Sequence, residues 1–164
     1  HLNRMRNVYR RKMNFSMSLL LLVLSIVYSF HFFESQSFIR AESQTIVQEN
    51  IVRAAQFITD EIRNAVELSL EDSYTEMPGY CTIFVEDSVL KYYDGSGTIV
   101  DKTEAVIDRF QVELEEKGSQ YSVNFHIGGL YQSQYYDITT GVVLNNLENA
   151  QPASGKSVIR YKKP

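Results

Sequence analysis

The chain has 164 residues, enough for one globular domain plus an anchor, and a formal net charge of −4. The charge is uneven: the segment up to Phe33 holds five basic residues and no acidic one, whereas the rest is acidic. An acidic globular part excludes a typical nucleic-acid-binding surface, which is basic. The one cysteine, Cys81, excludes an intramolecular disulfide, and we expect it to be buried in a strand as a small apolar residue.

A basic leader (residues 1–12) precedes an uncharged apolar segment, Met13–Phe33, that contains no Gly or Pro. About 20 such residues span a hydrocarbon core of ~30 Å as a helix, so we predict a membrane helix that includes Leu19, Leu22, Val23 and Ile26. The basic residues before it and Glu34 after it predict a cytoplasmic N-terminus and an exported remainder.

A cleaved signal peptide is the alternative for this segment. Its apolar stretch would be shorter and would end in a small-x-small cleavage site. The chain instead continues through aromatic residues to Glu34, so we favour an anchor that is either uncleaved or trimmed at its N-terminus.

The helix is expected to continue beyond the membrane, over residues 34–77, because no Gly or Pro occurs before Pro78. Apolar and small residues recur there at three- and four-residue steps, which is the pattern of an amphipathic helix. The stripe comprises Val47, Ile51, Ala54, Ala55, Ile58, Ile62, Ala65, Val66 and Ser69. We predict a helix from about Asn14 to Leu70, with Asn50 and Arg53 on its polar face. The residues expected to pack on the head are Ile51, Ala55, Ile58, Ile62 and Ala65.

Residues 78–164 are expected to form a β-rich head. The predicted strands are Tyr80–Val85, Val89–Tyr93, Ala105–Glu115, Tyr121–Ile127 and Tyr135–Leu144. We expect Gly128-Gly129 to break one strand and the lysine-rich C-terminal segment to be a solvated or edge segment. A long helix followed by an antiparallel meander predicts an α+β fold, with the helix laid across one small sheet.

No catalytic, metal-binding or phosphate-binding motif is recognisable, so we expect neither an enzyme nor a cofactor. His126 is expected to be an ordinary strand residue. The segment Asp94–Asp101 lacks the ligand spacing of an EF-hand and predicts a plain turn.

The Gln48–Val66 stretch, QENIVRAAQFITDEIRNAV, resembles a run that follows the membrane helix in the type IV pilin family. The resemblance is to J-type pseudopilins of type II secretion and to PilW-type minor pilins. Tyr92-Tyr93-Asp94-Gly95 and the Thr140–Asn146 segment are similar to the same branch. The resemblance implies a structural minor subunit of a type IV pilus or secretion-like filament. Its implied partners are the membrane, other pilins or pseudopilins, a prepilin peptidase and an assembly platform.

The family's G-F-T-L-I-E-type processing site corresponds here to Asn14-Phe15-Ser16-Met17-Ser18-Leu19. Asn14 replaces the glycine before the scissile bond, which normally lets the peptidase approach the backbone closely. Leu19 replaces the glutamate that pairs with a neighbouring subunit's amino terminus, so no buried charge requires a deeper neighbour. The resemblance therefore predicts a degenerate processing site between Asn14 and Phe15, and a position at or near a filament tip.

A different class also fits the chain. A single-pass anchored protein with an extracytoplasmic binding or sensory domain would show the same membrane segment and acidic head. A neighbouring prepilin peptidase or assembly ATPase would favour the filament subunit, and a cytoplasmic signalling partner would favour the sensor.

Overall fold

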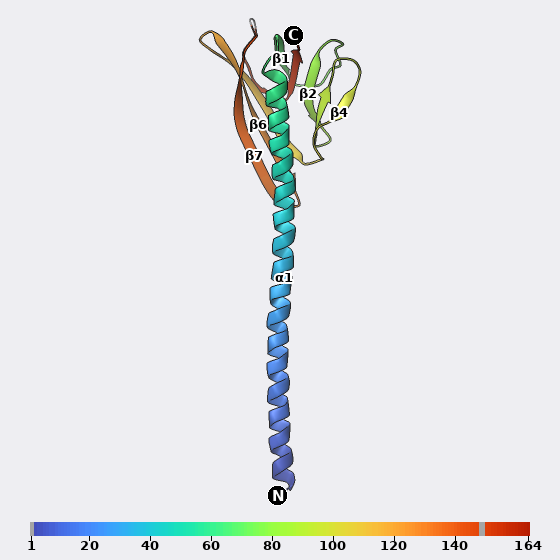
Figure 1. Ribbon diagram of the computed structural model, residues 1–164, viewed down its shortest axis with the longest axis vertical. Coiled ribbons are helices and arrows are strands. Elements are labelled where there is room, and N and C mark those ends of the chain that lie inside the picture. Colours follow the sequence, from blue (N-terminus) through green and yellow to red (C-terminus); the bar gives the residue numbers. More distant parts are fainter. Residues whose placement is uncertain (1, 148–149) are drawn as a thin grey trace. The chain divides into compact units, whose positions relative to one another are not determined.

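The computed structural model describes residues 2–147 and 150–164, which form one helix followed by nine strands (Figure 1). Helix α1 is Leu2–Ile62. The strands are β1 (Glu67–Glu71), β2 (Cys81–Glu86), β3 (Val89–Tyr93), β4 (Ile99–Asp101), β5 (Ile107–Lys117), β6 (Gln120–Tyr131), β7 (Gln134–Leu144), β8 (Ala153–Lys156) and β9 (Val158–Lys162). The chain divides into two compact units, His1–Glu42 and Ser43–Pro164, and α1 contributes to both.

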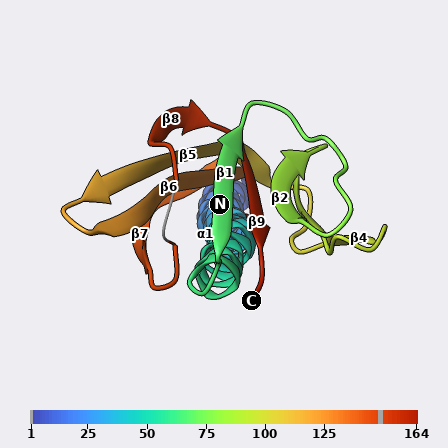
Figure 2. The same cartoon turned by 90° about the horizontal axis from the view of Figure 1, so that it is seen from above.

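The second unit, called the head below, contains two antiparallel sheets that flank the C-terminal part of α1 (Figure 2). The first sheet has the strand order β1-β9-β2-β3-β4, and the second has the order β7-β6-β5-β8. The predicted α+β class is therefore confirmed, but the single meander is wrong because the strands are divided between two sheets. The head also begins earlier than the expected residue 78, since it includes helix residues from Ser43 onward.

The predicted end of the helix is wrong by about two turns. Helix α1 ends at Ile62 rather than near Leu70, and residues expected to be helical form β1. The cause is long-range pairing: the Val66 N–H donates to the Lys162 carbonyl (3.0 Å), and β1 then pairs antiparallel with β9. Leu68 is buried and Ser69 exposed, as alternation in a strand requires.

The C-terminal segment differs in part from its prediction as a solvated or edge segment: β8, which holds Lys156, is an edge strand, but β9 is not. Strand β9 lies inside the first sheet, between β1 and β2, and four of its five residues are buried. Each basic residue there has an acidic partner, the pairs being Lys156–Asp72, Arg160–Glu71, Lys162–Glu67 and Lys163–Glu61. In β9 itself Arg160 and Lys162 are paired in this way, which lets a strand with two basic residues occupy the middle of a sheet.

The core of the head is the buried stripe of α1 packed against the inner faces of both sheets. From the helix it contains Val47, Ile51, Ala54, Ala55, Ile58 and Ile62, and alternate strand residues complete it. Strand β6 shows the alternation clearly, because Val123, Phe125 and Ile127 are each at most 1% exposed and face the helix. One stripe of the helix thus packs against both sheets.

Gly128 and Gly129 were expected to end a strand, but β6 runs through both to Tyr131. Gly129 faces the helix at a close approach of the two elements. A Cβ there would lie 2.8 Å from the Val106 carbonyl oxygen, 2.9 Å from Ile51 Cδ1 and 3.0 Å from Val47 Cγ2. The glycine therefore permits close packing of the strand on the helix rather than breaking the strand.

Replacement of Gly129 by alanine should destabilise the head by about 1–3 kcal/mol, because the methyl group overpacks a junction of backbone and helix side chains. The matched control is Gly128→Ala on the opposite face, where a Cβ meets the movable hydroxyl of Tyr135 at 2.6 Å. That variant should stay within about 0.5 kcal/mol of the wild type. Urea unfolding of the detergent-solubilised chain, followed by tyrosine circular dichroism, measures both. Equal losses in the two variants would contradict the close-approach explanation.

Candidate functional site

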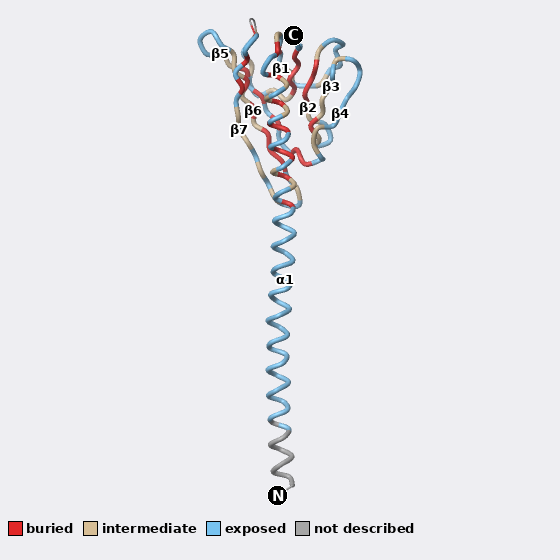
Figure 3. Tube along the Cα trace, viewed as in Figure 1, coloured by how far each residue is buried: buried red, intermediate tan, exposed pale blue. Residues whose placement is uncertain are grey.

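The first candidate site is the apolar segment Met13–Phe33 of α1. Its side chains are exposed along the whole length, including Leu19 (56%), Leu22 (59%), Val23 (49%) and Ile26 (47%) (Figure 3). The segment is long and apolar enough to cross a membrane. Exposure of this many apolar side chains in water is unfavourable, so a lipid environment or neighbouring helices must cover them.

The serines of this segment are compatible with such an environment. The hydroxyls of Ser18, Ser25 and Ser29 donate to the carbonyl oxygens of Asn14, Leu21 and Ser25 at 2.8–2.9 Å. Each hydroxyl is thereby satisfied within the helix, one turn back. None of these three serines therefore exposes an unpaired hydroxyl donor to the hydrocarbon region.

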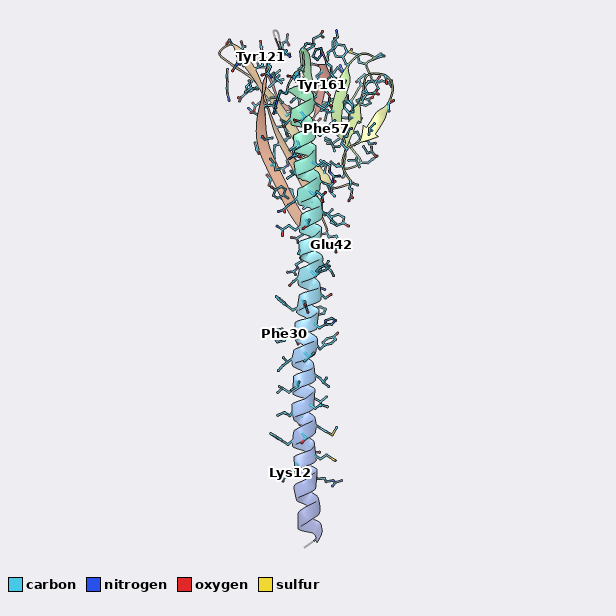
Figure 4. The ribbon with its side chains drawn as sticks, in the orientation of Figure 1. Lys12, Phe30, Glu42, Phe57, Tyr121 and Tyr161 are labelled. Atoms are coloured by element: carbon cyan, nitrogen blue, oxygen red, sulfur yellow. The ribbon has the colours of Figure 1, made fainter. Side chains whose placement is uncertain are left out.

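Different residues mark the two ends of the segment. Lys12 is exposed at the N-terminal end, and the exposed aromatic residues Tyr28, Phe30 and Phe33 lie near the other end (Figure 4 labels Lys12 and Phe30). Among these residue types, tyrosine is enriched at membrane–water interfaces. The side chains of the leader, apart from Arg10 and Lys12, lie outside the described residues.

The predicted processing residues, Asn14 and Phe15, lie within α1, and Phe15 is 71% exposed. The Asn14 carbonyl lies within the helix and accepts a hydrogen bond from the Ser18 hydroxyl. A peptidase that cuts after Asn14 must locally unwind this turn, because a helical backbone is bonded to itself and is not extended for cleavage.

The residues predicted to pack on the head, Ile51, Ala55, Ile58, Ile62 and Ala65, are all buried in the core. Asn50 was placed on the polar face, and that placement is wrong because it is 6% exposed. Its Nδ2 donates to the Ile46 carbonyl (3.0 Å) and its Oδ1 accepts the Glu104 N–H (2.9 Å). Asn50 thus ties the helix to the segment before β5, which a helical-face pattern cannot reveal.

A polar cluster at the end of the helix was not found from the sequence. The Glu61 carboxylate accepts a hydrogen bond from the buried Tyr161 hydroxyl and lies 2.8 Å from Lys163 Nζ. Burial, together with the nearby Glu61, raises the pKa of Tyr161 above its usual range, so its hydroxyl remains a donor. A carboxylate near a helix C-terminus is unfavourable by itself, and Lys163 and Tyr161 offset that cost while fixing β9 to α1.

Aromatic rings surround the same helix end. Phe57 and Tyr92 meet edge to face with centroids 5.4 Å apart, and Lys102 Nζ lies 4.7 Å from the Phe57 centroid. The Tyr92 hydroxyl donates to Cys81 Sγ at 3.4 Å. Cys81 is buried, as predicted. These contacts join the helix, the β2–β3 hairpin and the loop after β4, and they describe packing rather than a reactive centre.

The other candidates for chemistry have structural roles. His126 lies in β6 with Nε2 2.9 Å from an Asp137 carboxylate oxygen on β7. Asp94 Oδ1 accepts the N–H groups of Ser96 (2.8 Å) and Thr98 (3.2 Å), which is the predicted turn, and the Ser96 bonds lower the pKa of Asp94. Within residues 2–147 and 150–164, no group of three or more potential metal ligands occurs.

Replacement of Glu61 by alanine should destabilise the head by about 2 kcal/mol, because the buried Tyr161 hydroxyl loses its acceptor. The double variant E61A/Y161F should cost less than the sum of the single variants, since no donor is then left unpaired. The control is Glu49→Ala, which breaks only the exposed Glu49–Arg53 pair (2.7 Å) and should cost less than about 0.5 kcal/mol. Additive costs for Glu61 and Tyr161 in urea unfolding would rule out the coupling.

Comparison with known proteins identifies no family. No protein-family model, curated protein or solved structure matches the chain. The argument for function therefore depends on the residues, burial and contacts described above.

Proposed function

We propose that the chain is a minor pilin or pseudopilin, a structural subunit of a type IV pilus or of a type II secretion-like filament. The observation that supports the proposal is that two parts of α1 have different surroundings. Its Met13–Phe33 segment exposes only uncharged side chains, and its 47–62 segment forms the helical half of the head core. A helix that must be covered by lipid or other helices in one part, and carries a sheet-bearing head on another, is the layout of pilin-like subunits.

The resemblance of the Gln48–Val66 stretch to the pilin branch supports the same proposal, and most apolar positions of the stretch are buried, although Val52 is exposed (37%). Ile51, Ala55, Ile58 and Ile62 contact the sheets, whereas Arg53 is exposed and pairs with Glu49. In this proposal the basic leader faces the cytoplasm and the acidic head is exported. Other pilins, a prepilin peptidase and an assembly platform are the proposed partners.

A position at the filament tip follows from Leu19. This residue stands where the family has a glutamate, and its exposed apolar side chain needs no partner amino terminus. A subunit without that charge can end a filament without leaving a buried ion unpaired. We therefore place the subunit at or near the tip within this proposal.

Fractionation of the native host tests the filament assignment. Mechanical shearing should release the epitope-tagged chain together with filaments, and deletion of the assembly ATPase should abolish that release. Immunogold labelling should find the tag at filament ends. A chain that stays in the membrane fraction despite abundant sheared filaments would instead support an anchored binding or sensory domain. Even labelling along the shaft would contradict the tip position.

Restoring the small residue before the scissile bond should improve processing. With a prepilin peptidase in membrane vesicles, Asn14→Gly should be cleaved several-fold faster than the wild type, since glycine lets the enzyme approach the backbone. Leu19→Glu is the control, because it changes the assembly position and not the cleaved bond. Mass spectrometry of the mature N-terminus identifies cleavage between Asn14 and Phe15. Equal rates for Asn14→Gly and wild type would argue against this processing site.

A further inference from the structure

The outer face of the first sheet carries a second, smaller core. Phe84 of β2, Tyr93 of β3 and Val158 of β9 are each at most 3% exposed and form a buried cluster separate from the main core. Ile83 belongs to the main core, so its neighbour Phe84 points to the opposite face of the sheet. Among the described residues, the one apolar side chain packed on this cluster from outside the strands is Tyr74, between β1 and β2.

Residues 73–78, called the strap below, cover this second core with a single ring. The Tyr74 ring stacks on Phe84, with centroids 4.0 Å apart and planes 11° apart, and it meets Tyr93 edge to face at 6.1 Å. The strap forms no helix or strand, and all of its residues except Tyr74 are exposed. Burial of the outer cluster therefore depends on a segment that contributes one side chain to it.

The strap is fixed to the sheet at both of its ends. Just before it, the Asp72 carbonyl accepts a hydrogen bond from the Ser157 hydroxyl (3.0 Å). Just after it, the Gly79 N–H donates to the Gly95 carbonyl (3.0 Å). These two hydrogen bonds mark the points between which the strap can move.

Between those ends the backbone has few attachments. No N–H of residues 73–77 donates a hydrogen bond to any residue that the structure describes. The Thr75 carbonyl accepts Arg160 Nη2 at 2.9 Å, and a Glu76 carboxylate oxygen accepts the Tyr93 hydroxyl at 3.3 Å. A segment with so few hydrogen bonds opens at a much lower free energy than a paired strand.

The closed strap also leaves polar atoms unpaired. The Tyr74 hydroxyl, Thr82 Oγ1 and Arg160 Nε are buried and have no hydrogen-bond partner among the described residues. Thr82 and Arg160 are cross-strand neighbours on β2 and β9, and they are 0% and 8% exposed. A buried polar group without a partner loses the hydrogen bonds that water would give it, so each of these atoms destabilises the closed arrangement.

We propose that the strap opens and closes over the outer face of the first sheet while the main core stays folded. In the closed state Tyr74 covers the outer cluster. In the open state Phe84, Tyr93 and Val158 are uncovered, and the unpaired polar atoms gain water. The head thus has a second apolar face that is accessible only part of the time. The inference does not depend on the filament assignment, because all of its contacts lie within one head.

Thiol labelling of the full, detergent-solubilised chain tests this motion. In a Cys81→Ala background, Val158→Cys places a thiol beneath the strap and Val123→Cys places one in the main core, where the native valine is 0% exposed. Val143→Cys is the exposed reference. A maleimide should label Val158→Cys roughly tenfold or more faster than Val123→Cys, and more slowly than Val143→Cys. Low urea concentrations should accelerate labelling of Val123→Cys far more than that of Val158→Cys, since global unfolding exposes more surface.

Two further substitutions should change the labelling rate of Val158→Cys in opposite directions. Tyr74→Ala removes the ring that covers the cluster, so it should raise the rate several-fold. Thr82→Val removes a hydroxyl that is unpaired only while the strap is closed, so it should lower the rate several-fold. A change that merely loosened the head would not produce effects of opposite sign. If Val158→Cys does not fold, Thr82→Cys provides a second covered position and should give the same comparison with Val123→Cys.

The labelling rates also show when the proposal is wrong. Equal rates and equal urea dependence for Val158→Cys and Val123→Cys would overturn it, because the outer face would then open only with the whole head. Labelling of Val158→Cys as fast as that of Val143→Cys would mean that the strap does not close in solution. Rates unaffected by Tyr74→Ala and Thr82→Val would exclude the strap as the element that controls access.

Discussion

Burial of one stripe of α1 between two sheets is the constraint on which the head depends. Apolar residues from the inner faces of both sheets lie in one core cluster with this helix stripe. Ile51, Ile58 and Ile62 are fully buried in this position. Alanines at 54 and 55 and a glycine at 129 keep the backbones close. Loss of a well-packed isoleucine would therefore remove contacts to strands of both sheets at once.

The same helix must also satisfy a second environment. Between Met13 and Phe33 its exposed surface carries no charged Asp, Glu, Lys or Arg and is largely apolar all round, as suits lipid or a bundle of helices. Residues 34–42 are exposed and include Glu34, Arg40 and Glu42, and the buried stripe begins only with Ser43 and Val47. Two apolar surfaces of different geometry, separated by a charged stretch, are thus encoded on one helix. A purely soluble helix would need only the second of them.

Local patterns predicted the parts of the fold that depend on local physics. The β2–β3 hairpin, the Asp94 turn, the strands β5 and β7, and the helical stripe follow from periodicity, strand composition and turn residues, and the structure contains all of them. Strands β1, β4, β8 and β9 were missed, and β4 falls within Asp94–Asp101, which was predicted to be a plain turn. Strands β1 and β9 are each stabilised by the other, across a separation of about the whole head, whereas β4 and β8 are short edge strands that each depend on one partner strand. A sequence such as VIRYK carries no local sign that acidic partners elsewhere will neutralise it. Asn50 was misplaced for the same reason, since its partner at Glu104 is remote in sequence.

The position of β9 has a consequence for the order in which the head forms. β9 separates β1 from β2, so before it pairs, both of those strands expose an unpaired inner edge. Arg160 is 8% exposed and bonded to Glu71 and to the Thr75 carbonyl (2.9 Å), so the loop before β2 is fixed only when β9 arrives. Contacts between residues so far apart in sequence form slowly, because the entropy cost of closing the loop comes before the stabilising contacts form. Strand β9 is thus the element that completes the first sheet, because its pairing with β1 on one side and β2 on the other closes both inner edges.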